Sequence, residues 1–341
     1  MTSRLLLAAA LLVAIVVATS AGAVRIPPAS IVSMALARAG LTHGPHEAPS
    51  VEETIVFEVR LPRVLVAALV GAALSTAGVL FQALLRNPLA DPYAIGTSGG
   101  AALGAALGMT VAARFGNDII SAVPLLAFAG AVATTLLVYS LARVGGRTPI
   151  TTLLLAGVIV SVTFGYAMSL LLLLSDRYGR DTRLVYAWLL GGVTTVRWTQ
   201  VAVLGALVLG GCSISWAWAR RLNTLSLGEE SAASVGLDVE RFKTAVILVG
   251  SLLTAAAVSA AGLVGFVGLV VPHIARAVGG PNHTRLIPLA VLGGATFLVL
   301  ADLLARTVAP PTEIPLGIVT AFAGGPLFLY LLRRSRHAYR A

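Results

Sequence analysis

Long uncharged apolar runs, separated by short segments that carry the charges, are the dominant pattern along the chain. Many of these runs are about twenty residues long, the length that an α-helix needs to cross the hydrocarbon core of a bilayer. A transmembrane barrel would instead show segments of about ten residues with alternating polarity. The pattern predicts an all-α polytopic membrane protein, with a single domain over residues 1–341 and ten spans at 5–24, 64–85, 94–113, 119–141, 152–174, 200–219, 243–261, 263–277, 286–305 and 316–332.

Composition supports a membrane protein. Hydrophobic residues make up 57% of the chain and charged residues 11%, whereas a soluble domain typically carries about 25% charged residues. The formal net charge is +10, and we attribute it to arginines that orient the spans rather than to a nucleic-acid surface. Every basic residue except Lys243 is an arginine, which we interpret as a composition bias. The single cysteine, Cys212, and the scattered histidines predict neither a disulfide framework nor a metal site.

Charge also predicts the orientation of the chain. Ten spans place both termini on one side, and Arg4 together with the basic tail RRSRHAYR identifies that side as cytoplasmic. The segments assigned to the outside nevertheless hold more arginines than this rule alone would leave. The first run also resembles a signal peptide. Its apolar stretch is longer than usual for a signal peptide, so we favour a retained first span.

Residues 244–275 form a charge-free stretch that is too long for one spanning helix and short for two. Gly262, Gly265 and Gly268 recur within it at every third position, and Pro272 follows. This spacing predicts a full helix followed by a short, interrupted one. Irregular backbone persists at membrane depth only where it is buried in protein or lines a cavity, so these four residues are predicted to face a translocation pathway.

Stripes of small residues predict where helices pack closely. Gly100 and Gly104 begin one such stripe, and Gly71, Ser75 and Gly78 form a similar face on another span. Small residues allow the backbones of two helices to approach closely. Such packing matters in lipid, where burial of apolar surface contributes little to helix association.

Two kinds of energy coupling are missing from the sequence. Proton- and sodium-coupled carriers usually need an intramembrane carboxylate, but the deepest one here, Asp302, has Arg306 at i+4 to neutralise it. A P-loop needs a Gly-Lys-Ser/Thr sequence, and the only lysine, Lys243, follows Phe242. Nor is there a nucleophile–base pair or a carboxylate dyad. We therefore expect a non-enzymatic chain without its own cofactor, and ion-coupled secondary transport remains the alternative.

The stretch LNTLSLGEESAASVGLDVERFK, residues 222–243, is a charged island between apolar runs. Ser226 and Glu229 have the spacing of a capping box, and Gly236 suits a helix terminator. A short helix over about 226–236 is predicted, and it is too short to be stable by itself. A solvated loop is the ordinary interpretation of such an island. A capped helix on a membrane protein without a motor favours a docking element for a cytoplasmic ATPase.

Several motifs together resemble one family: RLPR (60–63), NPLADP (87–92), TTLLLAGV (151–158), LGEESAASVGL (227–237), GFVGLVVPH (265–273) and EIPLGIVTA (313–321). The combination resembles the permeases of type II ABC importers for vitamin B12, haem and iron–siderophores. The resemblance covers most of the chain from Arg60 onward and is only general before it. It implies a ten-helix permease in a bacterial or archaeal cytoplasmic membrane. It also implies a second permease copy (identical or a paralogue), two cytoplasmic ATPase subunits that use ATP-Mg, and an external binding protein.

The resemblance also implies roles for particular positions. The external arginines Arg60, Arg63 and Arg306 would bind carboxylates of the binding protein. The alternative is that they only extend their charged ends to the membrane–water interface. Residues in two turns would close the cytoplasmic mouth of the pathway: Asn87 and Leu89 in the first, Ile150 and Thr151 in the second. The coupling helix would seat in a cleft of the ATPase through Leu227, Gly228, Glu229, Glu230, Ala232, Ala233 and Gly236.

The implied cargo is a bulky metal chelate handed over by the binding protein. Ferric siderophore, haem and cobalamin permeases share all of these motifs. A ferric siderophore or haem ranks first and cobalamin next, because the iron branch of the family is the most populous.

Overall fold

The computed structural model describes residues 2–22, 24–41, 50–115, 122–176, 183–193 and 196–338, and within these ranges it contains helices and no strands. In chain order the helices are α1 (Thr2–Ser20), α2 (Pro28–Arg38), α3 (Val51–Thr54), the π-helix η1 (Ile55–Arg60), α4 (Leu61–Leu84), the 3-10 helix η2 (Pro92–Ile95), α5 (Thr97–Phe115), α6 (Val123–Ala142), α7 (Ile150–Asp176), α8 (Arg183–Leu189), α9 (Trp198–Ala217), α10 (Ala219–Ser226), α11 (Glu229–Ser234), α12 (Val239–Ala261), α13 (Val267–Gly279), α14 (His283–Thr307) and α15 (Leu316–Ala338).

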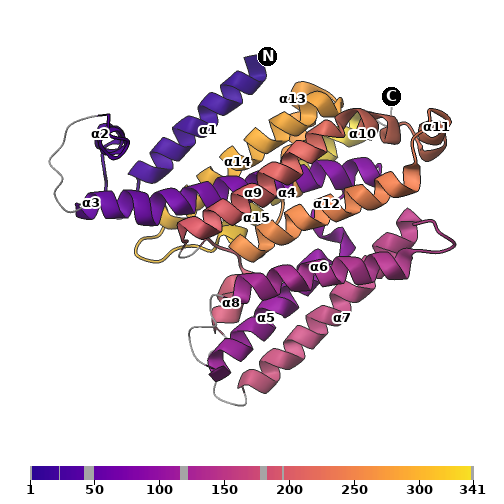
Figure 1. Cartoon of the computed structure of the whole chain (residues 1–341), viewed down its shortest axis with the longest axis horizontal. Helices are drawn as coiled ribbons and strands as arrows, with labels where there is room; N and C mark the ends of the chain where they lie inside the picture. Colours follow the sequence, from indigo (N-terminus) through magenta and orange to yellow (C-terminus); the bar gives the residue numbers. More distant parts are fainter. Residues whose placement is uncertain are drawn as a thin grey trace.

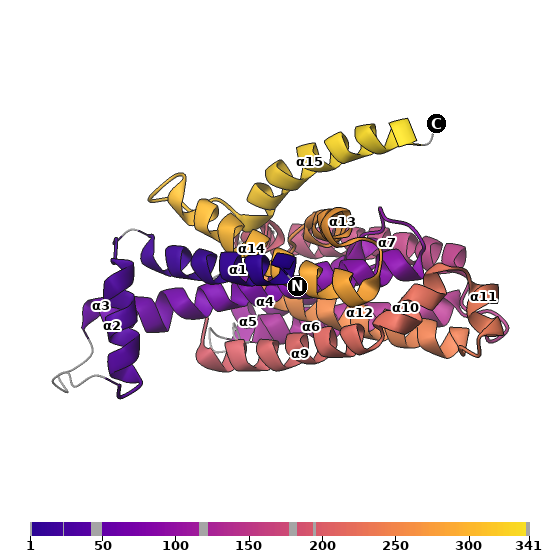
Figure 2. The same ribbon diagram turned by 90° about the horizontal axis from the view of Figure 1, so that it is seen from above.

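Helix α4 lies at the centre of the bundle, and nearly all of its residues are buried. It packs against α9, α12, α13 and α14. Helices α5, α6 and α7 pack on one another and form a second group, which joins the first where α5 and α6 contact α12 (Figure 1). Helix α15 contacts α13 and α14, and its C-terminal half extends away from the bundle (Figure 2).

Hydrogen bonds between distant segments define the two ends of the bundle. At one end Arg4 Nη2 donates to the carbonyl of Thr284 at 2.8 Å, and Trp216 Nε1 donates to the same carbonyl at 3.3 Å. The start of α1, the end of α9 and the start of α14 therefore meet there, near α10 and α11, and we name this the α11 end. At the other end, the α2 end, Trp198 Nε1 donates to the carbonyl of Phe57 at 3.1 Å. Figure 1 shows α2 and α11 toward opposite ends of the long axis.

Each of the ten predicted spans overlaps a helix of the structure. Within the described residues, seven segments are both long and apolar enough to cross a membrane: Ser3–Ser20, Val51–Leu84, Val123–Ala142, Ile150–Leu174, Trp198–Ala217, Val239–Ala261 and His283–Thr307. Two more apolar helices, Val267–Gly279 and Leu316–Tyr330, are shorter. The all-α, multi-span membrane fold is thus confirmed, while ten crossings stay a prediction.

Close approach of backbones explains the small-residue stripes. A Cβ atom on Gly71 would collide with the backbone of Gly294 in α14, and one on Gly78 would collide with the backbone of Gly268 in α13. In the second group, a Cβ atom on Gly100 would collide with Gly130 of α6. The helices can approach this closely only because these positions lack a side chain.

Candidate functional site

The charged island at the α11 end folds into two short helices. The predicted capping box between Ser226 and Glu229 is wrong, because Ser226 belongs to the last turn of α10 and its Oγ donates to the carbonyl of Leu222 at 2.8 Å. Gly228 then breaks the helix with a φ of +127°, and α11 begins at Glu229. The coupling helix expected over about 226–236 therefore spans only six residues, Glu229–Ser234.

The end of α11 follows the prediction. Gly236 has a φ of +87°, in the left-handed region that favours glycine. Its N–H donates to the carbonyl of Ala233 at 2.9 Å, and the N–H of Leu237 donates to the carbonyl of Ala232 at 3.1 Å. This pair of bonds is the Schellman motif, which satisfies carbonyls that a helix end leaves free.

Lys243 holds the short helix in place. Its Nζ lies 3.3 Å from Glu229 Oε1 of α11 and 2.9 Å from Glu240 Oε1 of its own helix, α12. The lysine side chain is only 4% exposed, whereas both carboxylates are partly exposed. A six-residue helix is not stable alone, so this ion pair supplies part of the support that the sequence had left unidentified.

The surface of the α11 region is partly apolar. Leu227 is 77% exposed and Val235 is 71% exposed, one on each side of α11. Glu230, Ala233 and Gly236 are also exposed, and Gly228 and Glu229 are partly so. Ala232 is fully buried, so it supports the helix from within and is not available to a partner. Val235 was not singled out from the sequence, although its position two residues after the predicted Ala233 could have indicated it.

The two predicted gate turns both lie next to this region. Asn87 Oδ1 accepts a hydrogen bond from the N–H of Leu89 at 2.9 Å, which stiffens the first turn. The guanidinium of Arg86, just before it, lies beside Gly228, since a Cβ atom there would be 3.6 Å from Arg86 Nη1. Leu89 is 41% exposed. Closure of a pathway by these residues stays a prediction.

The second gate turn connects to α12. Ile150 and Thr151 form the start of α7. Two residues earlier, the N–H of Thr148 donates to Glu240 Oε2 at 2.9 Å. Glu240 thus accepts from the backbone of this turn with one oxygen and pairs with Lys243 through the other. Sequence patterns carry no signal for this bond, because its donor is a backbone group.

The first gate turn also holds a partly buried carboxyl. Asp91 Oδ1 accepts from the N–H of Tyr93 at 2.7 Å and caps η2. Burial raises the pKa of Asp91 above its ordinary value, and the hydrogen bond from Tyr93 opposes this only in part.

The predicted break between α12 and α13 is confirmed. Helix α12 ends at Ala261, Gly262 has a φ of +65°, Phe266 has a φ of +68°, and α13 begins at the next residue. The glycines differ in their surroundings. A Cβ atom on Gly262 would collide with the Trp188 carbonyl, whereas one on Gly265 would meet no atom within 4 Å.

Gly268 and Pro272 lie deeper in α13, and both are buried. Gly268 packs against Pro92 and α4. Of the four positions predicted to face a pathway, only Gly265 has open space beside it in this chain, and a pathway role stays a prediction.

The three arginines at the α2 end all have partners within the chain. Arg60 is buried, and its guanidinium donates to the carbonyls of Thr19 and Ser20, both at 3.1 Å, and to that of Val24. These acceptors lie at the end of α1 and just beyond it. Arg60 therefore acts as a C-terminal cap for α1. This position is not free to grip a partner in the present conformation.

Arg63 and Arg306 share Asp302, whose side chain is 1% exposed. Arg306 Nε lies 3.1 Å from Asp302 Oδ2, which confirms the predicted i, i+4 pair. Arg306 also donates to the carbonyls of Ala18 and Ala21. Arg63 Nε donates to Asp302 Oδ1 at 3.0 Å, a partner that the sequence analysis missed. Docking by these arginines stays a prediction.

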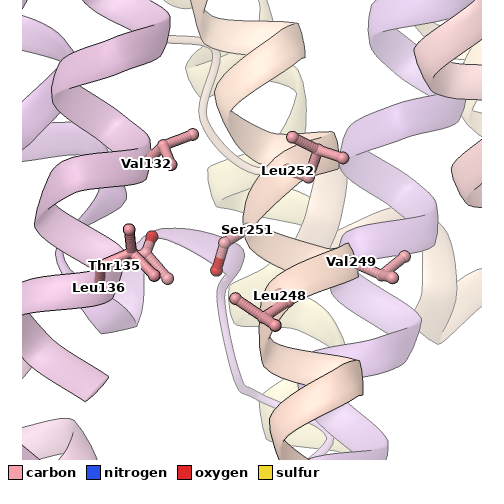
Figure 3. A pocket seen from close by; sticks show the side chains of 7 residues that line it. All are labelled: Val132, Thr135, Leu136, Leu248, Val249, Ser251 and Leu252. Carbon is pink, nitrogen blue, oxygen red and sulfur yellow. The ribbon is translucent and has the colours of Figure 1, made fainter. Parts of the chain in front are cut away.

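A hollow of about 200 Å³ lies between α6 and α12 (Figure 3). Small-molecule sites typically occupy about 300–1,000 Å³, so this hollow is too small for a chelate. Apolar side chains dominate its lining, with two hydroxyl groups: Val132, Thr135, Leu136, Leu248, Val249, Ser251 and Leu252.

A family model decides the relationship of the chain to known proteins. The model of the FecCD transport family matches residues 10–334. The chain belongs to the FecCD transport family. The match begins within α1, so the C-terminal half of the first helix is part of the family architecture. It also includes α11, both gate turns and the arginines of the α2 end.

Individual FecCD proteins support this membership. The chain is 42% identical over 285 residues to the cobalamin import system permease protein BtuC of Halobacterium salinarum, covering 84% of this chain and 75% of the relative. It is 40% identical over 290 residues to the hemin transport system permease protein HmuU of Yersinia pestis, covering 83% of this chain and 84% of the relative. Among solved structures, an inward-facing metal-chelate type ABC transporter superposes with a TM-score of 0.82 at 31% identity, covering 97% of this chain and 98% of the other.

Proposed function

We propose that this FecCD chain is the permease subunit of an ATP-driven importer for a bulky metal chelate. The observation that carries the proposal is the α11 region, where a helix of six residues is fixed by Lys243 between the exposed apolar side chains of Leu227 and Val235. Exposed apolar side chains flanking a charged, membrane-adjacent helix indicate a protein interface. A cytoplasmic ATPase is the partner that such a chain requires, because its only lysine is not in a P-loop.

The topology proposed for the permease has ten crossings with both termini in the cytoplasm. The start of α1, α11 and the basic C-terminal segment would then lie on the cytoplasmic side, in agreement with the positive-inside rule. Two permease copies, identical or paralogous, would enclose the pathway, and two ATPase subunits with ATP-Mg would bind the two α11 regions. The hollow between α6 and α12 is too small for a chelate, which supports a pathway between copies.

At the α2 end we propose that an external binding protein docks through Arg63. The Arg63 side chain is 17% exposed, and its partner Glu313 is 54% exposed. A carboxylate of the binding protein could replace Glu313 without disturbing the buried Asp302. Arg60 and Arg306 would support this surface indirectly by fixing the end of α1.

The transport cycle follows from alternating access. ATP-driven closure of the ATPase dimer would move both α11 regions, the gate turns would part, and the chelate would pass from the binding protein to the cytoplasm. The relatives transport cobalamin and hemin, and both are metal complexes of large organic rings. We propose a chelate of this class, with an iron complex ranked before cobalamin.

The test is uptake in host cells with and without the gene. Radiolabelled hemin, a ferric siderophore and cobalamin would each be supplied. Loss of one label on deletion, restored by a plasmid copy, would support the proposal and identify the cargo. Uptake that survives depletion of ATP with the proton gradient intact would contradict it and favour an ion-coupled secondary transporter.

A further inference from the structure

Three segments meet at Glu240 and Lys243: α11, the start of α12, and the turn between α6 and α7. Lys243 Nζ lies 3.3 Å from Glu229 Oε1 in α11. It lies 2.9 Å from Glu240 Oε1 in α12, and Glu240 Oε2 accepts from the N–H of Thr148 at 2.9 Å. A continuous path of polar contacts thus runs from the coupling helix to the second gate turn.

The turn that contains Thr148 is stiff. Val144 and Arg147 exchange two backbone hydrogen bonds, of 2.9 and 3.0 Å, and the two glycines between them have φ values of +58° and +80°. This is the geometry of a tight two-residue hairpin turn. Thr148 is buried beside it, and α7 begins two residues later at Ile150. A displacement of Thr148 should therefore move Ile150 and Thr151 as well, because the turn between them does not bend easily.

The choice of lysine is physically informative in a chain that otherwise uses arginine. A lysine ammonium is compact and has three donors, whereas an arginine guanidinium is larger and planar. Here a single buried ammonium is shared by two carboxylates from different helices. Removing it would leave two acidic side chains next to each other without a counter-charge, and the contact between α11 and α12 would loosen.

We propose that Lys243 and Glu240 are positioning residues that transmit movement of α11 to the gate turn before α7. Lys243 joins α11 to α12, and Glu240 joins α12 to Thr148, so the coupling helix and the second gate move as one unit. This inference rests on the proposed function, because it assumes that α11 contacts the ATPase. It adds the specific path by which ATP-driven movement reaches Ile150 and Thr151.

The test compares hydrolysis with transport in the assembled complex. The permease, its ATPase subunits and its binding protein are reconstituted in liposomes, and ATP hydrolysis and chelate uptake are measured together. The probe is the radiolabelled chelate that the cell assay identifies, which is hemin, the ferric siderophore or cobalamin. For Lys243→Met we expect ATP hydrolysis to persist while uptake per ATP falls about fivefold or more, the range of typical allosteric coupling.

A matched control lies on the same helix turn. Arg241 Nε pairs with Asp238 Oδ2 at 3.1 Å, also at i, i+3, but the arginine side chain is 90% exposed and both partners belong to the start of α12. Arg241→Met should leave uptake per ATP unchanged. Lys243→Arg keeps the charge but not the compact geometry, so it should lower the ratio less than Lys243→Met.

A milder variant covers the case in which Lys243→Met fails to assemble. Glu240→Gln retains an oxygen that can accept from Thr148 but loses the ion pair with Lys243. It should assemble normally and lower uptake per ATP. A proportional fall in hydrolysis and uptake, or an unchanged ratio in Glu240→Gln, would overturn the inference. If the wild-type complex hydrolyses ATP but accumulates none of the three chelates, the proposed function itself fails, and the inference that rests on it fails too.

Discussion

Arg63 and Glu313 form a bidentate ion pair, in which Arg63 Nη1 donates to Glu313 Oε1 at 3.0 Å and Arg63 Nη2 donates to Glu313 Oε2 at 2.9 Å. The same guanidinium also binds the buried Asp302. The RLPR motif in α4 is thereby tied to both α14 and the segment before α15. One arginine thus binds two segments that lie more than two hundred residues further along the chain.

The buried and exposed partners of Arg63 should differ in their effect on stability. Asp302→Ala leaves two arginines without their shared carboxylate in a buried site, and we expect a loss of about 3–5 kcal/mol. Glu313→Ala removes a half-exposed partner and should lower stability by about 0–1 kcal/mol. Denaturant titration of the purified protein in mixed micelles measures both. Equal losses would show that Asp302 is not the anchor of this cluster.

Arg60 should stabilise the first helix. Arg60→Ala removes the donors that satisfy the carbonyls of Thr19, Ser20 and Val24, so we expect a loss of about 2–3 kcal/mol. Protease cleavage near residue 22 should become faster in the same variant. Exposed Arg25 provides the control, and Arg25→Ala should change neither measurement. An Arg60→Ala protein with unchanged cleavage would contradict the capping role.

The contact between α4 and α13 should not tolerate a methyl group. Gly78→Ala places a Cβ atom against the backbone of Gly268, so the helices must separate, at a cost of about 1–3 kcal/mol or more. Gly210→Ala is the matched control in another helix, because a Cβ atom there meets nothing within 4 Å. Thermal unfolding in detergent compares the two variants. A Gly78→Ala protein as stable as Gly210→Ala would exclude the close approach.

The exposed apolar side chains of the α11 region should matter for assembly and not for folding. The double variant Leu227→Ser and Val235→Ser should reduce recovery of the ATPase subunits with the tagged permease about tenfold, the effect of losing about 1.4 kcal/mol of binding energy. Its melting temperature should be unchanged, because both residues are exposed. Leu41→Ser, an exposed leucine in the segment that precedes the α3 helix, serves as the control. Normal recovery in the double variant would place the ATPase elsewhere.

The partly buried carboxyl of Asp91 predicts a specific pH dependence. The pKa of Asp91 is raised in the folded protein, so the folded protein binds this proton more tightly than the unfolded chain does. The free energy of unfolding should therefore fall as the pH rises from about 4, near the unfolded pKa, through the folded pKa. Asp91→Asn removes this dependence and can still accept from Tyr93. The variant should therefore be no less stable than the wild type at neutral pH. A neutral-pH loss greater than the loss at acidic pH would show that the charged form is stabilised.

The sequence by itself determined where the apolar helices lie, because hydrophobic length is a local property that the bilayer imposes. It also determined the break after Ala261 and the pair between Asp302 and Arg306, since glycine spacing and i, i+4 neighbours are local too. The end of α11 at Gly236 follows from the same kind of information.

Tertiary structure decided the contacts that join distant segments. Ser226 and Glu229 have the spacing of a capping box, yet Ser226 completes the turn of α10 and Glu229 turns to Lys243. Arg60 and Arg63, neighbours in one motif, go to the end of α1 and to Asp302 with Glu313. The choice among partners depends on which groups folding brings within about 3 Å, and on the need to satisfy every buried charge and carbonyl. Local spacing cannot supply that information.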